Sequence, residues 1–364
     1  MKKRMIALLL IMVMLLAVVG CASESSTDNP GTGSTDSTTG NEQNDSSSYD
    51  NGSDIILSGT STGNIPDSLA EIPSEYFQEA EQQGTLVELE YDTFESFSYE
   101  EQSQFLTKRA IVYLPYGYSG DIQYDVFYFM HGGWSNETST LGTPGNENGF
   151  KNVLDNAIQN GEIEPLIVVC PTYNNTNENG QDSDSFSLAM QLTENYHNEL
   201  INDLLPAVEG TYSTYAEDVT AQGLADARDH RGFGGFSMGS VTTWRTFEYC
   251  MDYFRYYLPM SCGTSLDDEE IWQGANDYDQ EDYFVWMITG TRDFAYSYDE
   301  TRAEVMRDSE YFTETGALGN GNFAYTVKEG YSHDGTAAME YTYNGLRFFW
   351  GADAGSVDIE QGGL

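Results

Sequence analysis

The sequence predicts an α/β fold with a mainly parallel sheet and helices on both of its faces. Short runs of apolar, β-branched and aromatic residues alternate with segments of helical periodicity along most of the chain, which is the order of elements in such folds. A Gly-x-Ser-x-Gly motif lies between one of these runs and one of these segments. No second change of composition interrupts the alternation, so a single α/β domain is expected.

The predicted strands are short apolar sequences bounded by turn-forming residues. They are Leu86–Tyr91, Arg109–Leu114, Val126–Met130, Leu166–Cys170, Gly232–Phe236, Tyr256–Met260, Phe284–Thr289 and Phe323–Val327. The predicted helices are Gly149–Asn160, Ser185–Glu209, Met238–Cys250, Asp299–Thr315 and Thr336–Trp350. In the second helix, apolar residues such as Leu188 and Leu192 recur every four residues, which predicts an apolar stripe packed on the sheet. The polar segments Tyr173–Asp184 and Ser265–Asp282 are expected to be loops.

The N-terminus has the features of a secretion signal. Lys2, Lys3 and Arg4 precede fifteen apolar residues, Met5–Val19, and this run is shorter than the ~20 residues that span a bilayer. Val18-Val19-Gly20-Cys21 resembles a bacterial lipobox, whose cysteine becomes the lipidated first residue of the mature chain. We therefore expect an extracellular lipoprotein, anchored to the bacterial membrane at the cell surface through Cys21. An ordinary cleaved signal with an incidental cysteine is the alternative.

Composition divides the chain into four predicted parts. Residues 1–21 are the lipoprotein signal peptide, and residues 22–65 form a disordered tether rich in Ser, Thr, Asn, Asp and Gly, which has too little apolar surface to offset the entropy of ordering. Residues 66–352 form the α/β domain, and residues 353–364 are a C-terminal tail.

The charge and cysteine content limit the partners of the protein. The chain has 59 Asp and Glu against 15 Lys and Arg, a net charge of −44, and such a surface repels nucleic acid and anionic lipid. No nucleic-acid partner is expected, and the membrane is contacted only through the lipid. No His-Glu-x-x-His, clustered histidines or zinc-spaced cysteine pair occurs, so no metal or cofactor is predicted. Cys170, Cys250 and Cys262 are expected to be buried thiols, with a Cys250–Cys262 disulfide as the alternative.

The most informative segment is Gly235-Phe236-Ser237-Met238-Gly239. In α/β-hydrolases, a serine in Gly-x-Ser-x-Gly sits on a sharp turn from strand to helix with its hydroxyl exposed above the sheet, and the small flanking residues let the backbone pass close to that turn. The overlapping Gly232-x-Gly234-x-x-Ser237 is close to a dinucleotide fingerprint, but no acidic ribose ligand follows at the expected distance. Ser237 is the predicted nucleophile.

A serine nucleophile needs a histidine base, and only four histidines are present. His131 directly follows a strand, where an oxyanion-hole loop is expected; His197 lies on the polar side of a helix. His230 lies before the strand that leads to Ser237, so it is at the amino end of that strand whereas the serine is at the carboxyl end. His333 lies in a loop between the last strand and the last helix, which is the expected place for the base.

The chain order nucleophile, acid, histidine places the acid between Ser237 and His333. Asp293 lies on a turn at the end of the buried strand Phe284–Thr289 and is the predicted acid; Asp299 is the second choice. For the oxyanion hole, one backbone amide is expected from Met238, the residue after the nucleophile. The second is expected from Gly133 or Trp134 in the loop after His131.

Six segments of the chain resemble, in order, the esterase D-like enzymes of the first carbohydrate esterase family, which include feruloyl esterases and acetylxylan esterases. They are Arg109–Tyr118, Tyr128–Trp134, Val168–Tyr173, Glu199–Tyr212, His230–Gly239 and Gly330–Asp334. The resemblance extends over roughly Gly84 to Trp350. It implies an α/β-hydrolase fold and metal-free ester hydrolysis, with Ser237 as nucleophile, Asp293 as acid and His333 as base.

The resemblance implies two-step acyl transfer on an acylated plant cell-wall polysaccharide or oligosaccharide, with release of ferulate from xylan as the leading expectation. An acetylxylan or general short-chain acyl esterase is the alternative, and a non-catalytic glycan-binding surface lipoprotein is the alternative from another class. Trp134, Trp272 and Tyr296 are predicted to line the substrate site, because their rings can stack on a sugar or a feruloyl group.

Overall fold

The structure is a computed structural model that describes residues 65–66, 68–175, 182–316 and 320–350. These residues belong to one compact unit, Leu57–Leu364. The predicted signal peptide, the lipobox cysteine Cys21, nearly all of the predicted tether and the predicted tail lie outside the described residues. Within the described part of the chain, no helix has the length and apolar character needed to cross a bilayer.

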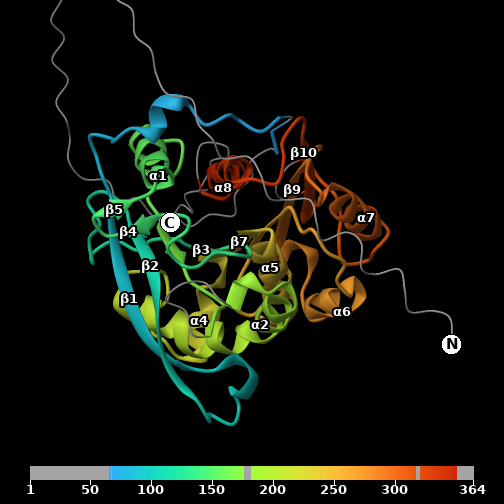
Figure 1. The fold of residues 1–364 in the computed structure, drawn as a ribbon, viewed down its shortest axis with the longest axis horizontal. Coiled ribbons are helices and arrows are strands. Elements are labelled where there is room, and N and C mark those ends of the chain that lie inside the picture. The colour runs from blue at the N-terminus through green and yellow to red at the C-terminus, as the bar shows by residue number, and fades with distance from the viewer. Residues whose placement is uncertain (1–64, 67, 176–181, 317–319, 351–364) are drawn as a thin grey trace, which may run out of the picture. The chain divides into compact units, whose positions relative to one another are not determined.

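An eight-stranded sheet forms the centre of the molecule (Figure 1), with the strand order β1-β2-β6-β3-β7-β8-β9-β10. Its strands are β1 Thr85–Phe94, β2 Phe105–Leu114, β3 Val126–Met130, β6 Ile167–Cys170, β7 Arg231–Phe236, β8 Tyr256–Met260, β9 Phe284–Gly290 and β10 Phe323–Lys328. β2 is antiparallel to β1 and β6, and the strands from β6 to β10 are parallel. A separate small hairpin pairs β4, Gly142–Thr143, with β5, Asn146–Glu147. Each predicted strand is present.

Helices cover both faces of the sheet (Figure 1). The helices are α1 Gly149–Gln159, α2 Phe186–Glu199, α3 Leu205–Thr211, α4 Ala221–Asp226, α5 Met238–Tyr249, α6 Asp268–Trp272, α7 Tyr296–Arg307 and α8 Gly335–Phe349. Short 3-10 turns occupy Ser74–Phe77, Ser96–Ser98, Asp182–Asp184, Arg228–His230, Gln273–Ala275 and Gln280–Asp282. The predicted arrangement, a mainly parallel sheet between two helical layers, is confirmed.

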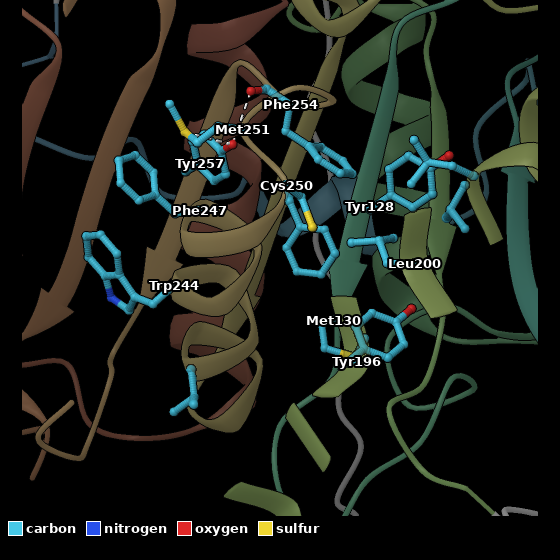
Figure 2. Packing of buried hydrophobic residues seen from close by; sticks show 14 of the residues in the cluster. Tyr128, Met130, Tyr196, Leu200, Trp244, Phe247, Cys250, Met251, Phe254 and Tyr257 are labelled. Carbon is cyan, nitrogen blue, oxygen red and sulfur yellow. Dashed lines mark hydrogen bonds between the residues drawn. The ribbon is translucent and has the colours of Figure 1, made fainter. Parts of the chain in front are cut away.

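The two cores follow from the alternation of side chains along each strand. In β3, Phe127 and Phe129 point to the face covered by α1 and α8, whereas Tyr128 and Met130 point to the face covered by α2 and α5. Figure 2 shows this second core, in which Trp244 and Phe247 of α5 and Cys250 directly after it belong to the same buried cluster as Tyr128 and Met130 of β3. Cys170, Cys250 and Cys262 are buried free thiols, as expected, and no disulfide joins Cys250 to Cys262.

The predicted helix Ser185–Glu209 is divided into α2, a π-helical turn at Leu200–Leu204, and α3. Pro206 explains the division, because proline has no amide to donate and its ring clashes with the carbonyl four residues earlier in an α-helix. The turn is widened so that the Leu205 amide donates to the Leu200 carbonyl, five residues earlier.

Two further predictions were wrong in their boundaries. The helix predicted at Asp299–Thr315 is α7, Tyr296–Arg307, because the Tyr296 amide donates to the Asp293 carbonyl and the helix begins directly after that turn. The segment predicted as the loop Ser265–Asp282 contains α6. Its acidic residues favour a helix N-terminus, since the Asp267 side chain accepts a hydrogen bond from the Glu270 amide and negative charge complements the helix dipole there.

Candidate active site

The predicted nucleophile, acid and base and the loop after His131 lie at one edge of the sheet. The strands from β6 to β10 are parallel, so their carboxyl ends meet at this edge. His131 follows β3, Ser237 follows β7, Asp293 follows β9 within a short turn, and His333 follows β10. Four segments that are distant in the sequence are thereby brought to the same edge.

Ser237 occupies a strained turn between β7 and α5. Its backbone has φ 61° and ψ −116°, a conformation that costs energy for a residue with a side chain and is typical of functional positions. The two motif glycines permit it. A Cβ atom on Gly235 would lie 2.5 Å from the Gly239 carbonyl carbon, and one on Gly239 would lie 2.2 Å from the Met130 carbonyl oxygen. The close approach of β3, β7 and α5 therefore requires glycine at both positions.

Asp293 and His333 form a hydrogen-bonded pair. His333 Nδ1 lies 2.8 Å from Asp293 Oδ1 and 2.9 Å from Oδ2, and Asp293 is buried. The Ala295 amide also donates to Asp293 Oδ1 at 2.7 Å, which fixes the carboxylate. Because a carboxylate only accepts hydrogen bonds, the proton of the neutral imidazole is assigned to Nδ1, and Nε2 is then free to accept a proton.

The loops that carry Asp293 and His333 are joined by their backbones. The Arg292 amide donates to the Tyr331 carbonyl at 2.9 Å, and the Gly330 amide donates to Thr291 Oγ1 at 2.8 Å. A Cβ atom on Gly290 would lie 2.3 Å from the Tyr331 carbonyl oxygen. Glycine at the end of β9 thus allows the contact that places the acid beside the base.

The His333 ring lies between two aromatic rings at the same edge. Its centroid is 4.5 Å from that of Phe236, the residue before the nucleophile, and 4.3 Å from that of Phe294. Among the described residues, no hydrogen bond joins Ser237 Oγ to His333. Catalytic hydrogen bonds of this kind are often long in free enzymes and shorten when substrate binds.

The oxyanion-hole amides expected from the sequence differ in their partners. Met238 is the first residue of α5, so its amide has no partner one turn earlier in the helix. The Trp134 amide donates to the Ser183 carbonyl at 3.0 Å and is therefore engaged. The Gly133 amide makes no hydrogen bond within the described part of the chain. Of the two residues predicted to supply the second oxyanion-hole amide, Gly133 therefore has the free N–H group. The prediction for Trp134 was wrong, because its amide is already bonded to Ser183.

The predicted substrate-binding aromatics have three different environments. Trp134 is 71% exposed at the site. Trp272 is buried and packs against Phe312 with ring centroids 5.4 Å apart, so its predicted role as a wall of the site was wrong. Tyr296 is partly buried at the start of α7, where its amide bonds to the Asp293 carbonyl. Trp272 lies in α6, whose apolar side faces the core and not the site.

Phe294 was not predicted as a site residue, but it directly follows Asp293 and lies against His333. It is 62% exposed, and its ring packs against the His333 ring at an angle of 40°. It also covers Gly263, where a Cβ atom would lie 2.2 Å from the phenylalanine ring. The sequence does contain a signal: a large apolar residue directly follows the predicted acid in an otherwise polar turn. An exposed phenylalanine on the catalytic loop is a natural contact for an aromatic substrate.

The other histidines and the second-choice acid have structural partners. His230 Nδ1 lies 2.8 Å from Asp125 Oδ1 at the start of β7, at the opposite edge of the sheet, and the His197 ring stacks on Tyr249. Asp299 accepts a hydrogen bond from the Cys262 amide and lies 3.6 Å from Arg302, and burial raises its pKa to about 8.

Within the described residues, no group of His, Cys, Asp or Glu side chains has the arrangement of a metal site.

His131 is a buried neutral histidine, because burial lowers its pKa to about 4. In the unfolded chain the pKa of a histidine is ~6.5. Between pH 4 and this value, the unfolded state therefore binds a proton at His131 that the folded state does not. The free energy of unfolding should therefore fall as the pH is lowered from 7 to 4, by about 3 kcal/mol from this residue.

The measurement is urea unfolding of wild type and His131→Asn at both pH values, since the amide does not titrate. The stability difference between the two proteins should shrink by about 3 kcal/mol at pH 4. An equal loss of stability in both proteins would contradict a neutral His131.

Comparisons with known proteins agree with this fold and with an esterase. The family described as "Putative esterase" matches residues 107–288, which include Ser237. The chain is 39% identical over 252 residues to endo-1,4-beta-xylanase Y of Acetivibrio thermocellus, covering 67% of this chain and 22% of that protein. It is 28% identical over 189 residues to an endo-1,4-beta-xylanase/feruloyl esterase of Xylanibacter ruminicola, covering 50% of this chain and 23% of that protein. The chain thus spans less than a quarter of each curated relative.

A solved structure extends the similarity beyond the family match. It is a serine-to-alanine mutant of the feruloyl esterase module from Clostridium thermocellum, complexed with sinapinate. The chain is 32% identical to it with a TM-score of 0.67, and the alignment covers 84% of this chain and 100% of that one. The alignment therefore extends over more of the chain than the family match does.

Proposed function

We propose that this chain, which belongs to the esterase family and is a serine esterase with an α/β-hydrolase fold, releases ferulate from acylated plant xylan. The observation that carries the proposal is the Asp293–His333 pair, whose histidine packs against Phe236 next to Ser237 and against the exposed Phe294 ring. The exposed Trp134 lies on the loop after β3 at the same edge of the sheet. The similar feruloyl esterase module binds sinapinate, which supports a phenolic acyl group as the substrate.

The proposed reaction transfers the acyl group to Ser237 and then to water. Ser237 Oγ attacks the ester carbonyl carbon while His333 Nε2 takes its proton, and Asp293 stabilises the resulting imidazolium. The Met238 and Gly133 amides stabilise the oxyanion. His333 then gives its proton to the departing sugar oxygen, and the acyl-enzyme forms. A water molecule, deprotonated by His333, attacks the acyl carbon and releases the acid, so that Ser237 regains its proton.

The charge of the protein agrees with a neutral polysaccharide substrate. A chain with a net charge of −44 would repel polyanions, whereas a xylan chain with feruloyl esters has no such penalty.

We further propose that a lipid on Cys21 holds the enzyme at the outer surface of the bacterium, which the lipobox-like sequence supports. Labelling of wild type with a fatty-acid probe, and loss of the label in Cys21→Ser, would test the anchor.

Replacing either exposed aromatic should weaken binding of phenolic substrates. We expect Trp134→Ala and Phe294→Ala to raise KM for methyl ferulate by about 3- to 10-fold, since an aromatic pair contributes ~0.5–1.5 kcal/mol beyond its buried area. KM for 4-nitrophenyl acetate hydrolysis should change less, because an acetyl group has no ring to stack. Steady-state kinetics on both substrates measure this difference.

Tyr116→Ala is the matched control. Tyr116 is 57% exposed and follows the end of β2, which is antiparallel to β6, so it lies at the opposite edge of the sheet. If wild type cleaves acetylated xylan readily and methyl ferulate poorly, the substrate is an acetyl ester. If it binds xylan oligosaccharides but hydrolyses no ester, the protein is a glycan-binding lipoprotein and the proposal fails.

A further inference from the structure

We propose that His131 and Tyr173 are positioning residues that orient the Gly132–Gly133 peptide so that the Gly133 amide faces the ester oxygen. Both side chains are buried. The inference rests on the proposed function, because it assigns these side chains a role in the oxyanion hole of that reaction. Neither residue needs to touch the substrate, since both act through one backbone peptide.

Both side chains bind the same carbonyl. His131 Nδ1 lies 2.7 Å from the Gly132 carbonyl oxygen, and Tyr173 Oη lies 3.1 Å from it. The two rings also pack against each other, with centroids 4.5 Å apart. The carbonyl therefore accepts two hydrogen bonds from a rigid pair of rings, one after β3 and one after β6.

The direction of the carbonyl determines the direction of the next amide. In a planar trans peptide, the Gly132 C=O and the Gly133 N–H point in opposite directions. The carbonyl points to His131 and Tyr173, so the amide points away from them. Gly132 also borders the nucleophile, because a Cβ atom there would lie 3.2 Å from the Phe236 carbonyl oxygen and 3.4 Å from Ser237 Cβ. The free Gly133 amide is thus held on the Ser237 side of the peptide.

The hydrogen bonds around His131 define a single tautomer. A carbonyl accepts, so Nδ1 carries the proton, and Nε2 then accepts a hydrogen bond from Thr172 Oγ1 at 2.7 Å. Thr172 Oγ1 in turn accepts from the Asn174 amide at 3.1 Å. Each group in this series of hydrogen bonds acts consistently as donor or acceptor, so the His131 ring cannot flip without losing a hydrogen bond.

A buried ion pair anchors the far end of this arrangement. Lys108 Nζ donates to the Thr172 carbonyl at 2.8 Å and pairs with Glu199 at 2.6 Å, and both side chains are almost fully buried. On the other side of the loop, the Trp134 amide donates to the Ser183 carbonyl, which holds Trp134 at its positive φ of 56°. The Gly132–Gly133 peptide is therefore fixed at both ends, as preorganised oxyanion stabilisation requires.

The sharpest test removes one hydroxyl group. Tyr173→Phe keeps the ring and deletes the hydroxyl, and with it the hydrogen bond to the Gly132 carbonyl and the interaction with the Ser183 side chain in the same loop region. We expect kcat for methyl ferulate to fall by about 3- to 10-fold with KM nearly unchanged, a fraction of the ~10²–10³ lost with a whole oxyanion donor. The rate at which a fluorophosphonate labels Ser237 should fall in parallel, because the phosphonyl oxygen occupies the same hole.

The matched control is Tyr257→Phe. Tyr257 Oη donates to the Phe254 carbonyl at 3.1 Å in a buried core away from the site edge, so the same type of hydrogen bond is lost there (Figure 2). Its kcat should equal that of wild type, even if both variants lose similar thermal stability. If Tyr173→Phe and Tyr257→Phe have the same kcat per folded molecule, the inference is wrong, although the proposed function stands.

A histidine series provides a second measurement. His131→Asn can place its amide nitrogen near the position of Nδ1 and donate to Gly132, whereas His131→Leu cannot donate at all. We expect kcat to fall by about 10²-fold in the leucine variant and to recover most of this loss in the asparagine variant. Equal kcat in the two variants would overturn the role of His131. Absence of ester hydrolysis in wild type would instead refute the proposed function.

Discussion

Ser237→Ala is expected to reduce kcat for methyl ferulate by about 10⁵-fold, leaving only the rate supplied by binding and the oxyanion hole. The hydroxyl is the group that forms the acyl-enzyme, and no neighbouring side chain can replace it on the strained turn. Because alanine differs by one oxygen atom, KM and thermal stability should change little. Stopped-flow and steady-state assays with purified protein measure the loss, and the variant should no longer react with a fluorophosphonate.

Ser240→Ala is the control for this experiment. Ser240 lies one turn along α5 and is fully buried, so a serine of the same local helix is changed without access to substrate. Its activity and phosphonate labelling should match those of wild type within about 2-fold, the range typical of a neutral substitution. Hydrolysis at the wild-type rate by Ser237→Ala would refute both the nucleophile and the serine mechanism.

Asp293→Asn should lower kcat by about 10⁴-fold at neutral pH while the fold remains intact. The carboxylate accepts the His333 Nδ1 proton through both oxygens, which leaves Nε2 able to take the serine proton. Asparagine can present its NH₂ group to Nδ1, so the opposite tautomer is favoured and the base is lost. The imidazolium formed during reaction also loses its counter-charge. A pH profile of kcat for the variant and wild type measures this change.

Asp299→Asn separates this role from that of a nearby carboxyl group. Asp299 is buried next to Arg302, and burial raises its pKa to about 8, so its surroundings favour the uncharged carboxyl group. Replacement by a neutral amide should therefore reduce kcat by less than about 10-fold. If Asp299→Asn lost activity as severely as Asp293→Asn at equal thermal stability, the acid would be Asp299.

The sequence predicted the strands more accurately than the helix ends. A strand such as Val126–Met130 is continuous, apolar and buried on both faces, and its limits match the structure. The helix predicted at Asp299–Thr315 began too late, because the turn at Asp293 already initiates α7. It also extended too far, because the backbones of Thr313 and Thr315 form hydrogen bonds with Asn322 and Phe323 at the start of β10. Hydrogen bonds to residues distant in sequence decided both ends.

The aromatic residues show the same limit. Composition and loop position pointed equally to Trp134, Trp272 and Tyr296, yet Trp134 is exposed and Trp272 is buried against Phe312. The sequence did not identify Phe294, although its exposed ring packs against His333. Whether a ring faces solvent or core depends on the direction of a helix or turn against the sheet, which local sequence does not contain.

Some properties of this protein follow from the sequence alone. The alternation of apolar runs and helical segments determines the α/β class, because each element must bury one apolar side. The Gly-x-Ser-x-Gly motif determines the strained turn at Ser237, since only glycine permits the contacts made at Gly235 and Gly239. The order of Ser237, Asp293 and His333 at strand ends predicts a common edge, because parallel strands bring their carboxyl ends together.

The tertiary structure alone decided which groups at that edge can interact. The contact of Gly290 with Tyr331 places Asp293 against His333, and the hydrogen bond to Ser183 engages Trp134 and leaves the Gly133 amide free. The orientation of that amide depends on His131 and Tyr173, which reach one carbonyl from two different strands. Apart from the bond between His131 and its neighbour Gly132, these contacts join residues far apart in the chain. Their geometry results from packing, which no local pattern of residues encodes.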